Sequence, residues 1–285
     1  MIKPYIIDEQ IRITELFSMF ECHRDKDYFF RGETHDFWEC VYVIDGDICV
    51  SGDERVYHIH KNDIVFHKPL ELHKYYNEAE NGSDLLIFSF NTSGKLTKYY
   101  ENKVFHLNTA QESLINQLIA FVRSNKISSC DCNIQIYLEP ANKSVIYLQY
   151  LSSVLEQLLL SLYEESAETS ASKAPDVIIF RKAVKYMNKN LDKQISINSL
   201  SKECNVSPTG IKRIFGKYSG LGIHKYFLTL KISKAAQYLK SHHSVTEISE
   251  LLGFSSQAYF SHVFKRETGL SPTEYIKQSN MNVQS

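Results

Sequence analysis

Short runs of β-branched and aromatic residues dominate the chain from about Tyr28 to Phe90. Turn dipeptides such as Asp45-Gly46 and Gly52-Asp53 separate these runs, which are five to seven residues long. The runs read WECVYVI, DICVSG, RVYHIH, DIVFH and LLIFSF. Many short strands at near-regular spacing are typical of a sandwich or barrel, so we predict a β-barrel in this part of the chain.

The hydrophobic period becomes helical after the predicted barrel. Leu114, Leu118 and Phe121 mark one helix, and a second runs from about Asn142 to Glu164. In the second helix, leucines recur at spacings of three and four: Leu148, Leu151, Leu155, Leu158 and Leu162. This stripe either packs on the barrel or pairs with a second copy of the chain. We favour pairing, and therefore a homodimer through the 142–164 helix.

A change in composition divides the chain further along. Residues 165–175, ESAETSASKAP, are small and polar and end in proline, which is typical of a linker. Everything beyond them has a helical pattern, with expected helices at Asp176–Leu191, Ile197–Glu203, Pro208–Tyr218, Gly222–Ser241, Val245–Leu252, Ser256–Glu267 and Pro272–Lys277. We therefore expect an α+β multidomain chain. Its expected parts are a β-barrel (1–107), a helical segment (108–165), a linker (166–175) and an all-α domain (176–285).

Helix boundaries are well marked in the last part. Ser207 precedes a proline, as an N-cap residue does. Ser244 with Glu247, and Ser271 with Glu274, have the spacing of capping boxes. The glycines listed with the repeat below stand where a left-handed residue ends a helix.

The all-α part contains an internal repeat with an offset of 49 residues. Four pairs fix the register: Ile211 with Phe260, Phe215 with Phe264, Gly220 with Gly269, and Tyr226 with Tyr275. Each copy contains a short helix, a turn and a second helix with a polar outer face. A duplicated helix-turn-helix indicates a protein that reads two neighbouring segments of one DNA duplex.

The second helix of each copy divides into an apolar and a polar face. In the first copy, Ile211, Ile214 and Phe215 should be core, which leaves Thr209, Lys212 and Arg213 outside. Lysine and arginine donate to the guanine edge in the major groove. Lys217, further along, suits a contact to phosphate.

The second copy presents a less charged face. We expect Tyr259, Phe260, Val263 and Phe264 to be core. The DNA-contacting candidates in this copy are Ser256, Gln257, Ala258, Ser261 and His262, followed by Lys265 and Arg266 for phosphate. Glutamine binds adenine in a bidentate manner.

The charge distribution agrees with this assignment. Residues 176–285 contain 16 Lys and Arg against 7 Asp and Glu, a net charge of +9. Residues 1–175 contain 16 against 26, a net charge of −10. A basic C-terminal part joined to an acidic N-terminal part indicates a polyanionic partner for the former. With no signal-like or membrane-spanning segment in the sequence, and six scattered cysteines, we expect a cytoplasmic location.

The last hundred residues contain the segments GFSSQAYF, FKRETG and SPTEY. Through these segments most specifically, this part of the chain resembles the AraC/XylS family of bacterial transcription regulators. The resemblance implies a double helix-turn-helix module that binds promoter DNA and works with RNA polymerase. It also implies base contacts by Thr209, Lys212 and Arg213, and by Gln257, Ala258 and His262. The sequence departs from the family pattern at several positions: Gly210, Lys231, His262 and Ile276.

Residues 28–90 resemble cupins. His35-x-x-x-Glu39, followed by Gly46, fits the first half of the cupin motif, and His73-x-x-x-Asn77 fits the end of the second. In AraC-like regulators such a barrel binds a small effector, for which a sugar is one candidate. The effector-binding candidates are His35, Phe37, Glu39, Val41 and His73.

The same residues allow a different class of function. Two histidines and a carboxylate suit a divalent ion, so the alternative is a metal-dependent cupin enzyme with a DNA-binding appendage. Since the first histidine of the usual cupin metal motif is Glu33 here, we expect no metal and no other cofactor, and no enzymatic activity.

Overall fold

The computed structural model describes residues 5, 7–28, 32–77, 79–124, 145–163 and 174–281. The N-terminal part holds eight strands among these residues: β1 (Arg12–Arg24), β2 (Trp38–Asp45), β3 (Asp47–Gly52), β4 (Arg55–His60), β5 (Asp63–His67), β6 (His73–Tyr76), β7 (Ser83–Ser93) and β8 (Val104–His106). A short 3₁₀ helix, η1 (Thr97–Tyr100), precedes β8. The five predicted strands are confirmed as β2 to β5 and β7.

The strands form two antiparallel sheets. The larger has the order β1-β7-β2-β5-β8 and the smaller the order β4-β3-β6. Alternate residues of β2 point to opposite faces. Val41 and Val43 pack between the sheets with Ile48 and Val50 of β3, whereas Tyr42 packs outward. The predicted barrel is therefore a domain of two packed sheets with its own apolar interior.

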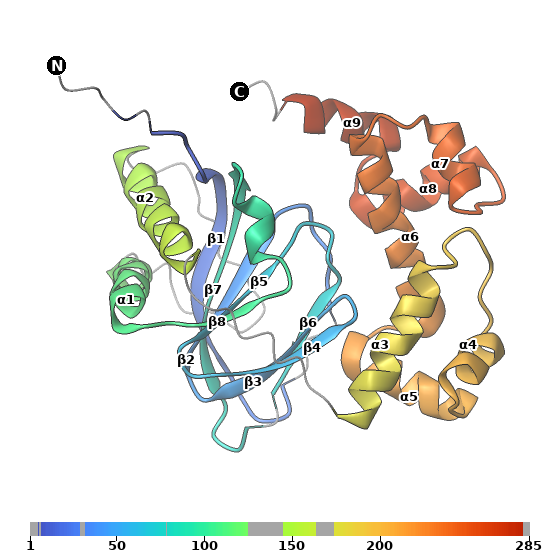
Figure 1. Cartoon of the computed structure of the whole chain (residues 1–285), viewed down its shortest axis with the longest axis horizontal. Helices are drawn as coiled ribbons and strands as arrows, with labels where there is room; N and C mark the ends of the chain where they lie inside the picture. The colour runs from blue at the N-terminus through green and yellow to red at the C-terminus, as the bar shows by residue number, and fades with distance from the viewer. Residues whose placement is uncertain are drawn as a thin grey trace.

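Two helices, α1 (Thr109–Ser124) and α2 (Val145–Leu162), cover the outer face of the larger sheet (Figure 1). Four of the five leucines of the predicted stripe are fully buried in the core beneath α2: Leu151, Leu155, Leu158 and Leu162. The fifth, Leu148, is half-buried. The Tyr100 hydroxyl donates to the Leu159 carbonyl at 2.8 Å and fixes the helix to the barrel. The interpretation of this stripe as a pairing surface is therefore wrong, because the sheet already occupies it. Positions 142–144 and 164 of the predicted helix lie outside the described residues.

Seven helices follow within residues 174–281: α3 (Pro175–Asn188), α4 (Ile197–Cys204), α5 (Pro208–Ser219), α6 (Ile223–Lys240), α7 (Val245–Leu251), α8 (Gln257–Thr268) and α9 (Pro272–Met281). Each agrees with a predicted segment to within a few residues. Most of the predicted linker lies outside the described residues.

The helices form two units that α6 joins (Figure 1). The core of the first contains Phe180 and Phe215, and that of the second contains Phe260 and Phe264. The prediction that Tyr259 belongs to this core is wrong, because its side chain is 49% exposed. It lies next to the buried Phe260 on the turn of the helix that faces solvent.

The predicted helix ends are confirmed. Ser207 Oγ accepts from the Gly210 amide at 3.0 Å, and Ser244 forms a complete capping box with Glu247. Gly220 and Gly269 cap α5 and α8 with φ of 68° and 80°, a region that glycine enters without steric cost. These caps fix where each second helix begins and ends, and so which residues its exposed end presents.

Candidate functional site

The exposed N-terminal end of α5 carries the first group of predicted DNA contacts. Thr209, Lys212 and Arg213 are all exposed, while Ile211 and Ile214 are buried beneath them. Arg213 forms an ion pair with Asp176 of α3, with its Nη2 atom 3.1 Å from the carboxylate. This exposed pair contributes little to stability, so the guanidinium remains available to a stronger anionic partner.

The corresponding end of α8 carries the second group. Ser256 is the N-cap and accepts from the Tyr259 amide at 3.1 Å, so it precedes the helix that was predicted to include it. Gln257, Ala258 and His262 are exposed, and Ser261 is half-buried. The Thr246 hydroxyl lies 3.0 Å from Gln257 Oε1 and orients the amide of the glutamine. The structure thus brings each predicted group together on one exposed helix end.

The three predicted phosphate contacts differ in their surroundings. Lys265 is exposed on α8. Arg266 Nη2 pairs with Glu267 at 2.8 Å. The Lys217 ammonium lies 5.8 Å from the ring centre of Tyr76, which belongs to β6 of the barrel domain. Lys217 therefore lies at the boundary between the two domains.

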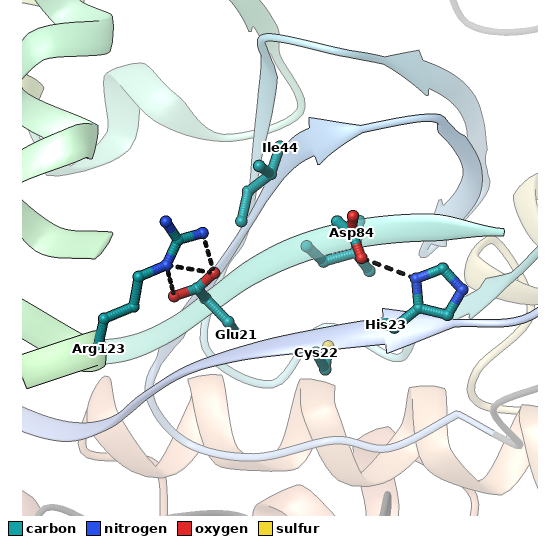
Figure 2. Close-up of a pocket in the computed structure, with 7 residues that line it drawn as sticks. Glu21, Cys22, His23, Ile44, Asp84 and Arg123 are labelled. Carbon is teal, nitrogen blue, oxygen red and sulfur yellow. Dashed lines mark hydrogen bonds and ion pairs between the residues drawn. The ribbon is translucent and has the colours of Figure 1, made fainter. Parts of the chain in front are cut away.

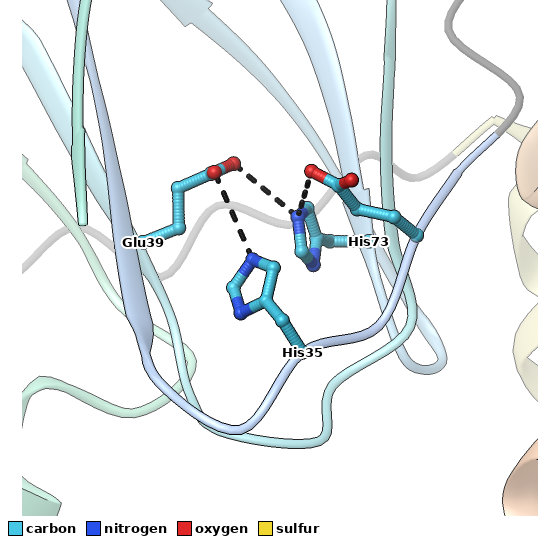
Figure 3. A group of neighbouring side chains, drawn as sticks. His35, Glu39 and His73 are labelled. Carbon is cyan, nitrogen blue, oxygen red and sulfur yellow. Dashed lines mark ion pairs between the residues drawn. The ribbon is translucent and has the colours of Figure 1, made fainter. Parts of the chain in front are cut away.

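A buried polar cluster forms where β2, β6 and the loop before β2 meet (Figure 3). His73 Nε2 lies 3.2 Å from Glu39 Oε1 and 3.7 Å from Glu33 Oε1, and His35 Nε2 lies 3.7 Å from Glu39 Oε2. One ligand atom from each of the four residues falls within 4.8 Å of the others. His73 is completely buried and Glu39 is 3% exposed. Of the predicted effector residues, His35, Glu39 and His73 are thus brought together.

The outer nitrogen of each cluster histidine is held by the backbone. His35 Nδ1 lies 3.0 Å from the Phe37 carbonyl, and His73 Nδ1 lies 3.1 Å from the Glu71 carbonyl. A carbonyl only accepts, so Nδ1 carries the proton in both rings. Nε2 of both rings is buried, and the nearest polar atoms to it are the carboxylate oxygens of the cluster. Two imidazole nitrogens are thus directed at two carboxylates.

The electrostatics of the cluster follow from this proximity. Burial works to raise the pKa of Glu39, but its contacts with His35 and His73 hold that pKa well below its usual range. Burial works to lower the pKa of His73, yet Glu33 and Glu39 raise it to about 10. The pKa of the neighbouring His67 is lowered, mainly because its side chain is buried. In the absence of a ligand, a proton on His73 compensates the carboxylates.

The remaining predicted effector residues have other roles in the fold. Phe37 stacks on His35 with ring centres 3.9 Å apart and covers one side of the cluster. Val41 is completely buried in the apolar core between the sheets. Sequence reasoning missed Glu33 as a member of the cluster and Tyr75, whose hydroxyl donates to Glu39 Oε1 at 3.1 Å. Glu33 occupies the position of the first histidine in the cupin metal motif, and this position could have identified it as a member of the cluster.

A pocket of about 280 Å³ lies between β1, β7 and α1, away from the cluster (Figure 2). Its charged groups pair with each other: Arg123 Nη2 with Glu21 at 2.8 Å, and His23 Nδ1 with Asp84 at 2.7 Å. Another polar group, Asp47 with His58 and His60, lies exposed on the smaller sheet. The sequence analysis predicted neither this group nor the pocket as a site.

Comparison with known proteins agrees with this arrangement. Residues 18–110 match the model of an AraC-like ligand binding domain, and residues 200–278 match that of a helix-turn-helix domain. The uncharacterized HTH-type transcriptional regulator YidL of Escherichia coli (strain K12) is 21% identical over 248 residues, 86% of this chain and 77% of that protein. The HTH-type transcriptional activator RhaR of Mannheimia succiniciproducens is 21% identical over 244 residues, 85% of each chain.

A third relative is similar over a shorter stretch. The Msm operon regulatory protein of Streptococcus mutans is 31% identical over 134 residues, 46% of this chain and 46% of that protein. Among the described helices, none has both the length and the hydrophobicity that crossing a membrane requires.

Proposed function

We propose that α5 and α8 of this chain read promoter DNA and that the buried cluster in the barrel binds the effector that controls this binding. The chain is a member of the AraC family of transcription regulators. The observation that carries the proposal is the presence of two capped helices with exposed polar ends on a domain of net charge +9. The contacts we assign to bases are Thr209, Lys212, Arg213, Ser256, Gln257, Ala258, Ser261 and His262. Those we assign to phosphate are Lys217, Lys265 and Arg266.

The connection between the two units suits this role. Helix α6 has 18 residues and is therefore about 27 Å long. Successive major-groove faces on one side of a duplex are about 34 Å apart. A helix of this length would allow the ends of α5 and α8 to enter two adjacent segments of the major groove. Neutralising several phosphates would make binding strongly dependent on salt.

The domain limits that we propose follow the observed elements. Strand β8 ends at His106 and α1 begins at Thr109, which supports a boundary near residue 107. Helix α3 begins at Pro175, which supports the start of the DNA-binding domain at residue 176. We also propose that the protein works in the cytoplasm, where promoter DNA is accessible, and that it acts there on RNA polymerase.

The outer face of α2, opposite the buried leucine stripe, is a candidate surface for pairing two copies of the chain. It exposes large apolar side chains, Ile146, Tyr147, Tyr150 and Leu160, and Tyr163 directly after the helix is exposed as well. Aromatic residues that remain exposed on a helix favour an interface. We propose that this face, rather than the stripe, pairs two copies. The oligomeric state of Tyr150→Asp in analytical ultracentrifugation, compared with the wild type, tests it, and an unchanged mass contradicts it.

We propose that the barrel senses and does not catalyse. Its relatives named above are transcription regulators, and the alternative is a metal-dependent cupin enzyme with a DNA-binding appendage. An assay of metal-loaded protein for turnover of oxidisable or hydrolysable small molecules distinguishes the two, because turnover contradicts a purely sensory role.

The test of the DNA-reading proposal is a mobility-shift assay with fragments from the promoter regions around the gene. Lys212→Ala with Arg213→Ala removes two contacts that are worth about 1–3 kcal/mol each. We therefore expect the Kd to rise by about 30-fold or more. The matched control is Lys185→Ala with Lys189→Ala, which removes the same charge from two exposed positions at the C-terminal end of α3, the second being its C-cap. Equal losses in the two double variants would contradict the assignment of the first reading helix.

A further inference from the structure

We propose that Asp47, His58 and His60 form a surface site for a late first-row divalent metal ion, of the class of Zn²⁺, Ni²⁺ and Cu²⁺. The site lies on the outer face of the smaller sheet, on β3 and β4, and shares no residue with the buried cluster around His73 or with the recognition helices. It therefore stands independently of the proposed function.

The register of β3 and β4 brings the three side chains to one face. His58 and His60 are two residues apart on β4, so their side chains leave the strand on the same side. Asp47, the first residue of β3, is directly opposite His60 in the antiparallel ladder. Ile59, between the two histidines, is completely buried between the sheets. Both histidines therefore point outward, and the backbone ladder fixes their spacing.

The helical domain covers only part of this face. Cys49 and Val56 belong to the same face by alternation, and they pack in the core of the first helix-turn-helix unit. The side chains of Asp47 and His58 are 35% and 48% exposed, and His60 is exposed as well. The three polar side chains thus lie beyond the edge of that packed area, where an ion in solution reaches them.

The distances among the ligand atoms suit a single ion. His58 Nε2 lies 2.5 Å from Asp47 Oδ2, and one ligand atom of each of the three residues falls within 4.8 Å of the other two. Nitrogen and oxygen ligands lie about 2.0–2.2 Å from Zn²⁺, so neighbouring ligands of a tetrahedral site are about 3.4 Å apart. Small rotations, which exposed side chains make readily, would bring all three atoms to that separation.

The contact between His58 and Asp47 marks the place of the ion. A carboxylate only accepts, so the hydrogen of this contact is on His58 Nε2. A bound ion takes its place, and the neutral ring then carries its hydrogen on Nδ1, a shift that water mediates. The described contacts of His60 are a backbone hydrogen bond to Asp63 at 2.9 Å and the ring contact with His58. The ring nitrogens of His60 are therefore available to the ion.

The charge beside the three residues attracts cations. A hollow of about 210 Å³ adjoins the site, and four carboxylates line it: Asp45, Asp47, Glu80 and Asp84. No lysine or arginine is among its described lining residues, although Lys26 and Lys61 pair with two of the carboxylates. A concave surface lined by one sign of charge raises the local concentration of counter-ions. Divalent cations should therefore concentrate next to Asp47.

The ligand set selects the class of ion. Imidazole nitrogen suits Zn²⁺, Ni²⁺ and Cu²⁺, whereas Mg²⁺ and Ca²⁺ prefer sites made of oxygen ligands. Three protein ligands on an exposed sheet leave at least one coordination position for water or another small ligand. The site is therefore open, unlike a structural zinc site with four protein ligands, and it should also bind an ion that is already held by a chelator.

This access provides the test. Ni²⁺ held on a resin by iminodiacetate meets surface histidines but not His73, which is completely buried. For tag-free, full-length protein, His58→Gln with His60→Gln should lower the imidazole concentration needed for elution about twofold or more, since two linked ligands hold one ion more tightly than either does alone. The control His23→Gln with His106→Gln removes two exposed histidines from opposite edges of the larger sheet and should elute with the wild type. An equal fall in both double variants overturns the site.

A second pair of variants tests the carboxylate. Asp47→Asn should lower the imidazole concentration for elution, because it removes a ligand. Asp45→Asn removes the same charge from a neighbouring exposed carboxylate, whose side chain is 65% exposed, and should leave the elution unchanged. If the two variants elute together, Asp47 acts through its charge alone, and the three-ligand site is overturned.

A third measurement needs no variant. In wild-type protein with isotopically labelled histidine, paramagnetic Ni²⁺ added in steps should broaden the imidazole signals of His58 and His60 before those of His23 and His106. The latter two each lie beside a carboxylate but have no second histidine next to them among the described residues. Simultaneous broadening of all four signals, or sharp His58 and His60 signals throughout, overturns the site.

Discussion

The two helix-turn-helix units have the same architecture but differ in their relation to the barrel. In the first, the recognition helix α5 carries Lys212 and Arg213 at its exposed end, and its opposite end accepts hydrogen bonds from Lys74 and Ser51 of the barrel. In the second, the direct polar contacts with the barrel come from Tyr275 of α9 and from Ser233 and Lys240 of α6, and none of these residues belongs to the recognition helix. This difference indicates that a movement of the barrel would reach α5 through direct hydrogen bonds, and α8 only through the packing of its unit.

The largest expected effect tests whether the two units are equivalent in stability. Phe215 and Phe264 occupy matching positions of the repeat and are both completely buried. Phe215→Ala and Phe264→Ala should each lower the free energy of unfolding by about 3–5 kcal/mol, measured by urea denaturation. The core of the first unit also includes several residues of the barrel domain, among them Leu72 and Tyr76, whereas that of the second includes only Leu70 among the described residues, so Phe215→Ala should destabilise the barrel more. A barrel transition that moves equally in both variants would contradict the unequal attachment.

A smaller effect tests the link between the units. Lys231 of α6 is 4% exposed and donates to the Lys193 carbonyl at 3.2 Å and the Leu252 carbonyl at 2.8 Å. Lys231→Met would leave these acceptors unpaired, so we expect a loss of about 2 kcal/mol in thermal or urea unfolding. Lys231→Arg, which keeps the charge and the donors, is the matched control. Equal stability of the Met variant and the wild type would show that α6 does not need this link.

The next prediction compares the two recognition helices on DNA. Gln257→Ala with His262→Ala should raise the Kd for a promoter fragment about tenfold, because one bidentate base contact is worth about 1–3 kcal/mol. The loss should be smaller than that of the Lys212 and Arg213 double variant, and the slope of affinity against salt should change less, since no lysine or arginine is removed. A larger loss from the second helix would reverse the proposed division of roles.

The smallest effect concerns the caps of the first helix in each unit. Ser196 caps α4 by accepting from the Ser199 amide, and Ser244 caps α7 in a box with Glu247. Ser196→Ala and Ser244→Ala should each cost about 1 kcal/mol in thermal unfolding. Ser→Gly at the same positions should cost only a few tenths of that amount. If the alanine and glycine variants behave alike, the caps do not stabilise these helices.

The sequence predicted the reading helices with good accuracy because their signals are local. A capping serine, a following proline and a terminal glycine each act within one helical turn, so Ser207, Pro208 and Gly220 set the ends of α5 without help from the rest of the chain. The strands β2 to β5 were predicted equally well, because turn residues mark their ends. Strand β1 was missed because half of its pattern is polar, and β6 and β8 because they are four and three residues long.

The leucine stripe and Tyr259 were misinterpreted for a related reason. Periodicity shows that Leu151, Leu155 and Leu158 share an apolar face, but it does not say which surface covers that face. Here the sheet covers it. Tyr259 has a large apolar ring but is exposed, because its place on the helix directs it away from the core into which Phe260 packs.

By itself, the sequence determined the class of the protein, the duplication and the exposed ends of the recognition helices, since each depends on residues close together along the chain. Only the tertiary structure decided that Glu33 joins His35, Glu39 and His73, and that Lys74 and Asp36 on the same two segments reach α5 and α9. Contacts between residues 140 to 240 positions apart are set by how whole sheets and helices pack. No local pattern records such contacts, because packing depends on the sum of many weak interactions across the chain.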